Sequence, residues 1–116
     1  MKISEIVSTL DAKVLCGEDK LDAEIGAAFG SDMMSDALAF MHDRTVLLTG
    51  MVNPHVIRTA EMLDVECVVF VRGKAVPEEV LEKGAEQGMV LLTTPKTLYT
   101  SCGLLYGKGL RGCERT

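Results

Sequence analysis

Apolar positions along this chain follow two periods, one helical and one extended. Apolar residues recur every three or four positions over residues 3–10, which predicts a short amphipathic helix. Further along come continuous apolar runs, which are typical of strands buried on both faces of a parallel sheet. The strongest run, residues 67–71, is rich in valine, and valine favours strands. The pattern therefore predicts strands separated by helices.

The ends of the predicted elements follow from glycine, proline and capping residues. Strands are predicted at residues 13–16, 25–29, 45–49, 67–71 and 89–92. Helices are predicted at residues 3–10 and 32–41, and as helices that begin at Pro54, at Pro77 and at Pro95. The predicted N-caps of three of these helices are Ser31, Asn53, and either Thr93 or Thr94. Residues 18–22 are predicted to form a turn.

Strand and helix alternate from about residue 25 onward, which indicates a single α/β domain. We expect a mainly parallel sheet of about five strands with helices on both faces. Residues 1–24 are expected to pack a helix and a short strand on this domain, residues 25–106 to form its core, and residues 107–116 to form a flexible tail. The length of 116 residues suits one domain with one core.

The predicted helix at residues 32–41 is apolar on nearly every side. Such a helix has to be covered on more than one side, either within the domain or by a second subunit. The chain is therefore expected to form a homodimer. The candidate interface residues are Met33, Met34, Phe40 and Met41.

Composition and charge narrow the range of partners. Hydrophobic residues make up 47% of the chain, so it is expected to fold. The net charge of -5 argues against nucleic acid as a partner, because lysine and arginine supply the affinity for its phosphates. No stretch approaches the ~20 apolar residues that span a bilayer, and the first residues do not resemble a signal peptide. We expect a cytoplasmic protein that binds neither membrane nor nucleic acid.

Four cysteines are spread along the chain: Cys16, Cys67, Cys102 and Cys113. No two have the CxxC spacing of a zinc ribbon or of a thioredoxin-type motif. We expect them to be small buried hydrophobic residues, with Cys113 as the exception. It lies in a polar segment between arginines, which would expose it and lower its pKa. The sequence leaves open whether Cys102 and Cys113 are redox-active.

The loops after the predicted strands carry hydroxyls, glycines and two cations. The carboxyl ends of parallel strands meet at one edge of a sheet, where ligands commonly bind. Such residues favour phosphate or carboxylate, so we predict a site for a small anion or a nucleotide. Every one of them is also an ordinary cap or turn residue, and this structural explanation stays open. The candidates are Ser31, Asp32, Thr49, Gly50, Asn53, Arg72, Gly73, Lys74, Thr93 and Thr94.

Signals for catalysis are weaker. The sequence has no GxxxxGK[ST] phosphate loop, no GxSxG nucleophile elbow and no HExxH zinc motif. Asp32 and Asp36 lie one helical turn apart, yet a helix-start charge and a solvated side chain account for them. We therefore expect no catalytic residues, no metal site and no cofactor.

Three segments resemble the DRTGG domain: GSDMMSDALAF (residues 30–40), TVLLTG (45–50) and VVFVRGKAVPEEVLEKGAEQGMVLLTTPKTLYT (68–100). This small α/β module occurs in some phosphate acetyltransferases, in some CBS-containing pyrophosphatases and as short free-standing proteins. The resemblance covers about residues 25–105. The family carries Asp-Arg after one strand and Thr-Gly-Gly after the next, where this chain has Gly50-Met51-Val52-Asn53 and Arg72-Gly73-Lys74. Its version of the site is therefore altered and more basic.

The resemblance implies a non-catalytic regulatory or interaction module that forms a homodimer, and whose protein partner would belong to a neighbouring metabolic enzyme system. Some relatives carry names that suggest kinases, but without the phosphate loop we expect no kinase activity here. Three hypotheses follow: a module that senses an anion or nucleotide, a structural partner domain of a larger enzyme system with no ligand, and an enzyme with an unrecognised site.

Overall fold

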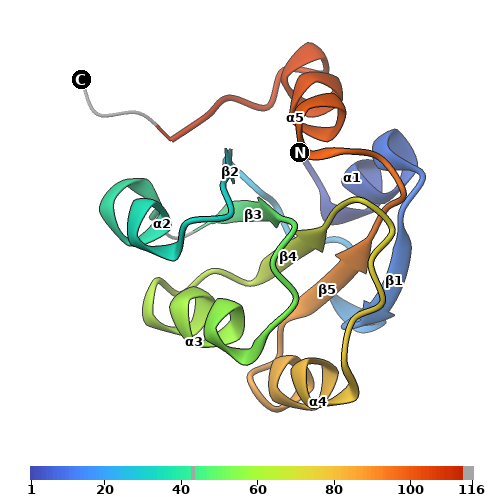
Figure 1. Ribbon diagram of the computed structural model, residues 1–116. Coiled ribbons are helices and arrows are strands. Elements are labelled where there is room, and N and C mark those ends of the chain that lie inside the picture. The colour runs from blue at the N-terminus through green and yellow to red at the C-terminus, as the bar shows by residue number, and fades with distance from the viewer. Residues whose placement is uncertain (43, 114–116) are drawn as a thin grey trace.

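The strands form one sheet in the order β1-β5-β4-β3-β2 in the computed structural model, which describes residues 1–42 and 44–113 (Figure 1). From β2 to β5 neighbouring strands run parallel, whereas β1 joins β5 antiparallel at the far edge. The predicted mainly parallel five-stranded sheet is confirmed. The strands are β1 (Lys13–Cys16), β2 (Ala27–Gly30), β3 (Thr45–Thr49), β4 (Cys67–Phe70) and β5 (Val90–Thr93).

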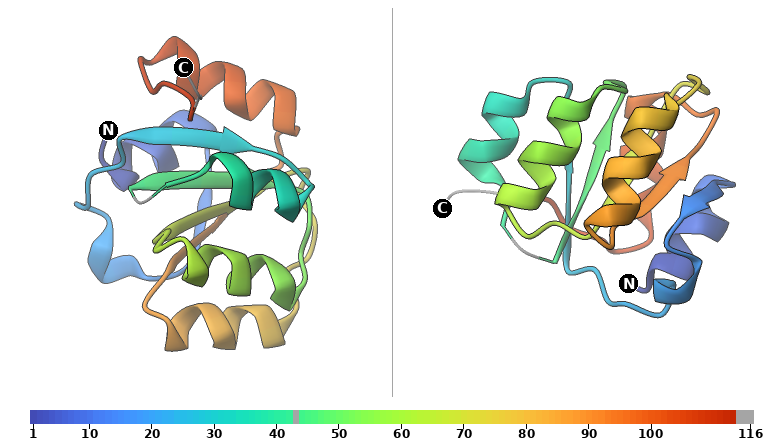
Figure 2. Two further views of the ribbon diagram at one scale, coloured as in Figure 1. Left: turned by 90° about the vertical axis from the view of Figure 1, so that its left-hand side faces the viewer. Right: turned by 90° about the horizontal axis from the view of Figure 1, so that it is seen from below.

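Helices cover both faces of the sheet, as predicted. Figure 2 shows α2, α3 and α4 side by side on one face, and α1 and α5 on the other. None of the helices in the described part of the chain is long and apolar enough to cross a bilayer. The helices are α1 (Ile3–Leu10), the short 3-10 helix η1 (Glu18–Lys20), α2 (Met34–Phe40), α3 (Pro54–Met62), α4 (Glu78–Glu86) and α5 (Leu98–Gly107).

Successive residues of the central strands point into two separate cores, one on each face of the sheet, because side chains alternate across a strand. In β3, Val46 and Leu48 pack with residues of α1 and α5. The residue between them, Leu47, packs with residues of α2, α3 and α4. All five residues of β3 are buried. This double burial explains why the strands read as continuous apolar runs.

Helix α2 begins later than predicted. The Ser31 hydroxyl accepts a hydrogen bond from the Met33 N–H at 2.9 Å, so Ser31 closes a turn ahead of the helix and Met33 is the N-cap. Met34 and Met41 are buried in the domain's own core, and we withdraw them as interface candidates. Met33 and Phe40 remain 61% and 41% exposed.

Helix α5 also begins later than Pro95. Its N-cap is Thr97, whose hydroxyl accepts from the Thr100 N–H at 3.5 Å. The preceding residues form a bend instead, and their carbonyls bond to the loop after β4: Thr94 accepts from the Gly73 N–H and Lys96 from the Arg72 N–H, at 3.0 and 2.8 Å. The predicted cap at Thr93 or Thr94 is therefore wrong.

The residues after α5 differ from the flexible tail that the sequence predicts. The Ala28 N–H donates to the Arg111 carbonyl at 2.8 Å, and the Cys113 N–H donates to the Ala28 carbonyl at 3.2 Å. Residues 111–113 thus lie along the outer edge of β2, whose backbone groups need partners (Figure 1). Cys113 is buried with its sulfur 3.3 Å from Thr45 Oγ1, which corrects its predicted exposure. Residues 114–116 lie outside the described residues.

Burial sets the acidity of the other thiols. It raises the pKa of Cys67, which is fully buried in β4, to about 12. Burial also raises the pKa of Cys16 and of Cys102. Since the thiolate is the reactive form, these three side chains are poor nucleophiles in the folded chain.

Candidate functional site

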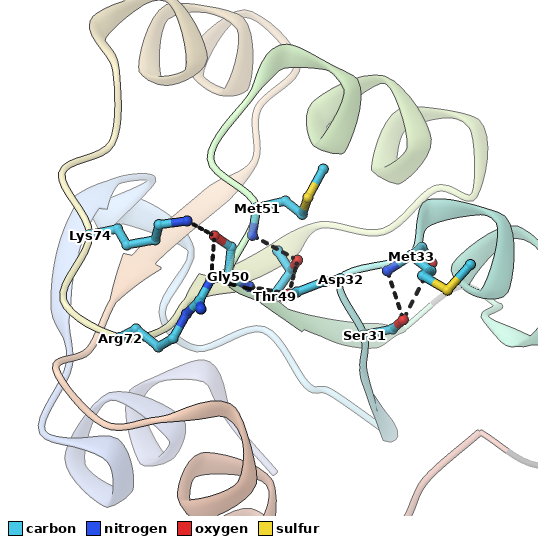
Figure 3. A network of polar contacts seen from close by, with 8 residues as sticks. All are labelled: Ser31, Asp32, Met33, Thr49, Gly50, Met51, Arg72 and Lys74. Atoms are coloured by element: carbon cyan, nitrogen blue, oxygen red, sulfur yellow. Dashed lines mark hydrogen bonds and ion pairs between the residues drawn. The ribbon is translucent and has the colours of Figure 1, made fainter.

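The carboxyl ends of β2, β3 and β4 lie next to one another. Gly30 pairs with Leu48, and Thr49 pairs with Phe70, so the loops that leave these strands start side by side. Figure 3 shows that side chains from these three loops meet around the Gly50 peptide. We call this group the strand-end cluster; it consists of Asp32, Thr49, Gly50, Arg72 and Lys74.

Asp32 fixes one side of the cluster. Its Oδ1 accepts from the Gly50 N–H at 2.7 Å and from the Thr49 hydroxyl at 3.2 Å. The same hydroxyl accepts from the Met51 N–H at 3.1 Å, so Thr49 is fully used and is buried. The carboxylate therefore joins the exit of β2 to the exit of β3 and has a defined orientation.

Two cations form the other side. Lys74 Nζ donates to the Gly50 carbonyl at 2.9 Å, and Arg72 Nη2 donates to the same oxygen at 3.4 Å. Arg72 Nη2 also lies 3.9 Å from Asp32 Oδ2. Two positive charges thus converge on one neutral oxygen with one carboxylate beside them. The cluster carries a net positive charge at an exposed edge of a protein that is acidic as a whole.

Local backbone geometry places Arg72. Arg72 and Gly73 have φ of 69° and 63°, in the left-handed region, which is uncommon for arginine. This turn is held by two hydrogen bonds, from the Arg72 N–H to the Lys96 carbonyl and from the Gly73 N–H to the Thr94 carbonyl. Gly50 lies opposite, and a Cβ there would overlap the Arg72 guanidinium, so a larger residue would displace this half-exposed side chain. The loop after β3 therefore lies directly against the side chain of Arg72 in the loop after β4.

The structure does not bring all predicted site residues into the cluster. Ser31 bonds with Met33, in a separate network in Figure 3. The Asn53 side chain caps α3 by accepting from the His55 N–H at 3.0 Å. Thr94 is buried, and its hydroxyl donates to the Leu10 carbonyl at 2.7 Å.

Two further candidates have backbone roles. Thr93 ends β5 in register with Lys13 and Phe70, and Gly73 supplies the turn beside Arg72. Sequence reasoning missed Lys96, whose carbonyl holds the Arg72 backbone. A main-chain contact of this kind leaves no signal in residue type.

Comparisons with known proteins agree with this architecture. The family model for the DRTGG domain matches residues 5–106, a range that takes in most of α1 and all of β1. Among solved structures, the chain is similar to the CBS and DRTGG domains of the regulatory region of Clostridium perfringens pyrophosphatase, complexed with the activator diadenosine tetraphosphate. The TM-score is 0.76 at 18% sequence identity, over 90% of this chain and 45% of that chain.

No curated protein matches. The chain spans less than half the length of the solved pyrophosphatase region. A family model that covers residues 5–106 matches most of the sequence, including every strand of the sheet and nearly all of the helices on both of its faces. The chain belongs to the DRTGG domain family.

Proposed function

We propose that this chain is a non-catalytic regulatory module that binds a phosphate-bearing ligand at the strand-end cluster. The observation that carries the proposal is the convergence of Arg72 and Lys74 on the single carbonyl of Gly50. A phosphate group offers these donors a charged acceptor in place of a neutral one, and hydrogen bonds between charged groups are the stronger kind.

The regulatory role rests on the family and on the solved relative. That relative is the regulatory region of a pyrophosphatase, and its activator, diadenosine tetraphosphate, is rich in phosphate. In the present chain, a phosphate at Arg72 would compete with the Gly50 carbonyl and with Asp32. Binding would then change how the exits of β2, β3 and β4 are held together, and a ligand that favours one such arrangement shifts the population toward it.

Replacing Arg72 with alanine tests the ligand site. We expect the affinity for ATP, measured by isothermal titration calorimetry, to fall by about 10- to 100-fold, since hydrogen bonds to charged groups contribute about 1.5–3 kcal/mol. Alanine has the same backbone restriction as arginine, so the turn at residue 72 gains no new strain. The matched control is Arg58→Ala, which removes an exposed arginine from α3.

Unchanged affinity in Arg72→Ala would remove the cluster as the binding site. If the wild-type chain binds no ATP and shows no rise in Tm with nucleotides or phosphate, the alternative of a structural partner domain without a ligand is favoured.

A second proposed role is self-association through the surface of α2. Met33 and Phe40 are exposed there, and Phe40 stacks on Phe29 of the edge strand β2 with ring centroids 5.9 Å apart. Exposed apolar side chains that lie together mark association surfaces. We propose that this surface, defined by Phe29, Met33 and Phe40, forms a homodimer.

The double variant Met33→Ser/Phe40→Ser tests the dimer. We expect the mass from sedimentation equilibrium to fall from that of a dimer to that of a monomer, because the variant removes the apolar contact area. Tyr99→Ser is the control, since Tyr99 is exposed on α5, on the opposite face of the sheet. A monomeric wild-type chain, or a double variant that stays dimeric, would contradict the proposal.

A further inference from the structure

One oxygen in the strand-end cluster is free to accept a hydrogen bond from a ligand. Asp32 Oδ1 takes both protein donors, the Gly50 N–H and the Thr49 hydroxyl. Its Oδ2 accepts no hydrogen bond from the residues that the structure describes, and its ion pair with Arg72 is long, at 3.9 Å. The Asp32 side chain is 47% exposed. A fixed carboxylate oxygen thus faces solvent beside two cations.

This mixture of groups is poorly suited to a bare inorganic anion. Arg72 and Lys74 attract phosphate, but the adjacent Asp32 carboxylate repels it. An ionised carboxylate only accepts hydrogen bonds, so its natural partner is a hydroxyl or an amine. A ligand that uses the whole cluster therefore carries a phosphate for the cations and a hydroxyl for Asp32.

Both kinds of group lie within the reach of one small molecule. The two cations share the Gly50 carbonyl at 2.9 and 3.4 Å, and the Asp32 Oδ2 is 3.9 Å from one of them. All of them stand at the carboxyl ends of adjacent parallel strands. Ligands of open α/β sheets commonly bind beyond the carboxyl ends of the strands, and in dinucleotide-binding sheets an acidic residue there accepts from a ribose hydroxyl.

We propose that the strand-end cluster selects a phosphorylated sugar, free or as part of a nucleotide, over inorganic phosphate, and that Asp32 is the residue that determines this specificity. This inference rests on the proposed function, because it requires Arg72 and Lys74 to hold the phosphate. It adds the class of ligand and a specific role for the carboxylate.

Titration of the full chain with three probes tests the inference: ribose 5-phosphate, methyl phosphate and inorganic phosphate. Calorimetry at constant ionic strength is expected to show that ribose 5-phosphate binds about 10-fold more tightly than the other two, which corresponds to one hydrogen bond to a charged group. Methyl phosphate is a phosphate ester without hydroxyls, so it separates ester recognition from hydroxyl recognition on the unaltered protein.

The variant Asp32→Asn isolates the carboxylate. Its amide oxygen can still accept from Gly50 and Thr49, while an NH₂ group replaces the free oxygen. We expect this variant to lose the preference for ribose 5-phosphate and to bind inorganic phosphate at least as tightly as the wild type. Asp36→Asn, which changes an exposed aspartate one helical turn further on in α2, is the control and should keep the preference.

The outcomes separate the two proposals. Equal affinity of the wild type for the three probes would overturn the inference about Asp32 while leaving the phosphate site intact. The same holds if Asp32→Asn tightens the binding of all three probes equally, because Asp32 would then only compete for Arg72. If none of the probes binds, both the phosphate site and the inference fail.

Discussion

Replacing Gly17 with alanine is expected to lower the free energy of unfolding by about 2–5 kcal/mol, the sum of a left-handed backbone penalty and of overpacking. Gly17 has a φ of 87° directly after β1. A Cβ there would lie 2.7 Å from the Met89 carbonyl oxygen and 2.8 Å from the Val90 Cα. Both are backbone atoms in or beside β5, so they cannot swing away as a side chain could. Urea denaturation followed by circular dichroism would measure the loss.

The matched control is Gly103→Ala in α5. A Cβ at Gly103 would meet nothing within 4 Å, so the substitution adds helix propensity at no steric cost. We expect it to raise the free energy of unfolding by about 0.5–1 kcal/mol. If Gly17→Ala were as stable as the wild type, the close approach of the β1 exit to β5 would be refuted.

Replacing Thr94 with valine is expected to lower the free energy of unfolding by about 1–3 kcal/mol, the cost of a buried carbonyl left without its donor. Thr94 is fully buried, and its hydroxyl donates to the Leu10 carbonyl at the end of α1, 2.7 Å away. The bond joins α1 to the end of the sheet. The affinity for ATP should fall far less than in Arg72→Ala, because the Thr94 side chain reaches the strand-end cluster only indirectly, by accepting from the Lys96 N–H at 3.3 Å. Weaker ATP binding at unchanged stability would return Thr94 to the ligand site.

Replacing Ser101 with alanine is expected to raise the free energy of unfolding, in contrast to Thr94→Val. Ser101 is also fully buried, but within the described residues its hydroxyl has no hydrogen-bond partner. Removing a buried polar group that is unsatisfied relieves its desolvation cost. Urea denaturation should therefore show Ser101→Ala to be more stable than the wild type. A loss of stability would show that this hydroxyl has a partner such as a buried water.

The fold could be predicted well because the central strands carry their signal in side chains. The apolar runs of β3 and β4 are buried on both faces, so their hydrophobicity is continuous and their identity unambiguous. The first residue of each helix was harder to predict. Thr94 and Ser31 have the chemistry of N-caps, yet neither begins a helix. The carbonyls of Thr94 and Lys96 accept from the Gly73 and Arg72 N–H groups, and the Ser31 hydroxyl closes a turn with the Met33 N–H. Residue type alone does not reveal such competition.

The candidate site could be predicted in part for the same reason. Five of the ten candidates meet in the strand-end cluster, because they follow the carboxyl ends of adjacent parallel strands. Asn53 and Thr94 have similar chemistry, but each is used by a nearby backbone group. The sequence could not show that Asp32 Oδ2 is free. This depends on the folded loop after β3, whose Gly50 N–H donates to Oδ1.

The position of β1 in the sheet has a consequence for the order of folding. Each of β2, β3 and β4 pairs with the next strand along the sequence, whereas Lys13 of β1 pairs with Thr93 of β5, across most of the chain. Closing a longer loop costs more entropy, and contacts between distant residues slow folding. We therefore expect the parallel strands to assemble first. During synthesis on the ribosome, we expect α1 and β1 to leave the exit tunnel early and β1 to lack its strand partner until β5 follows.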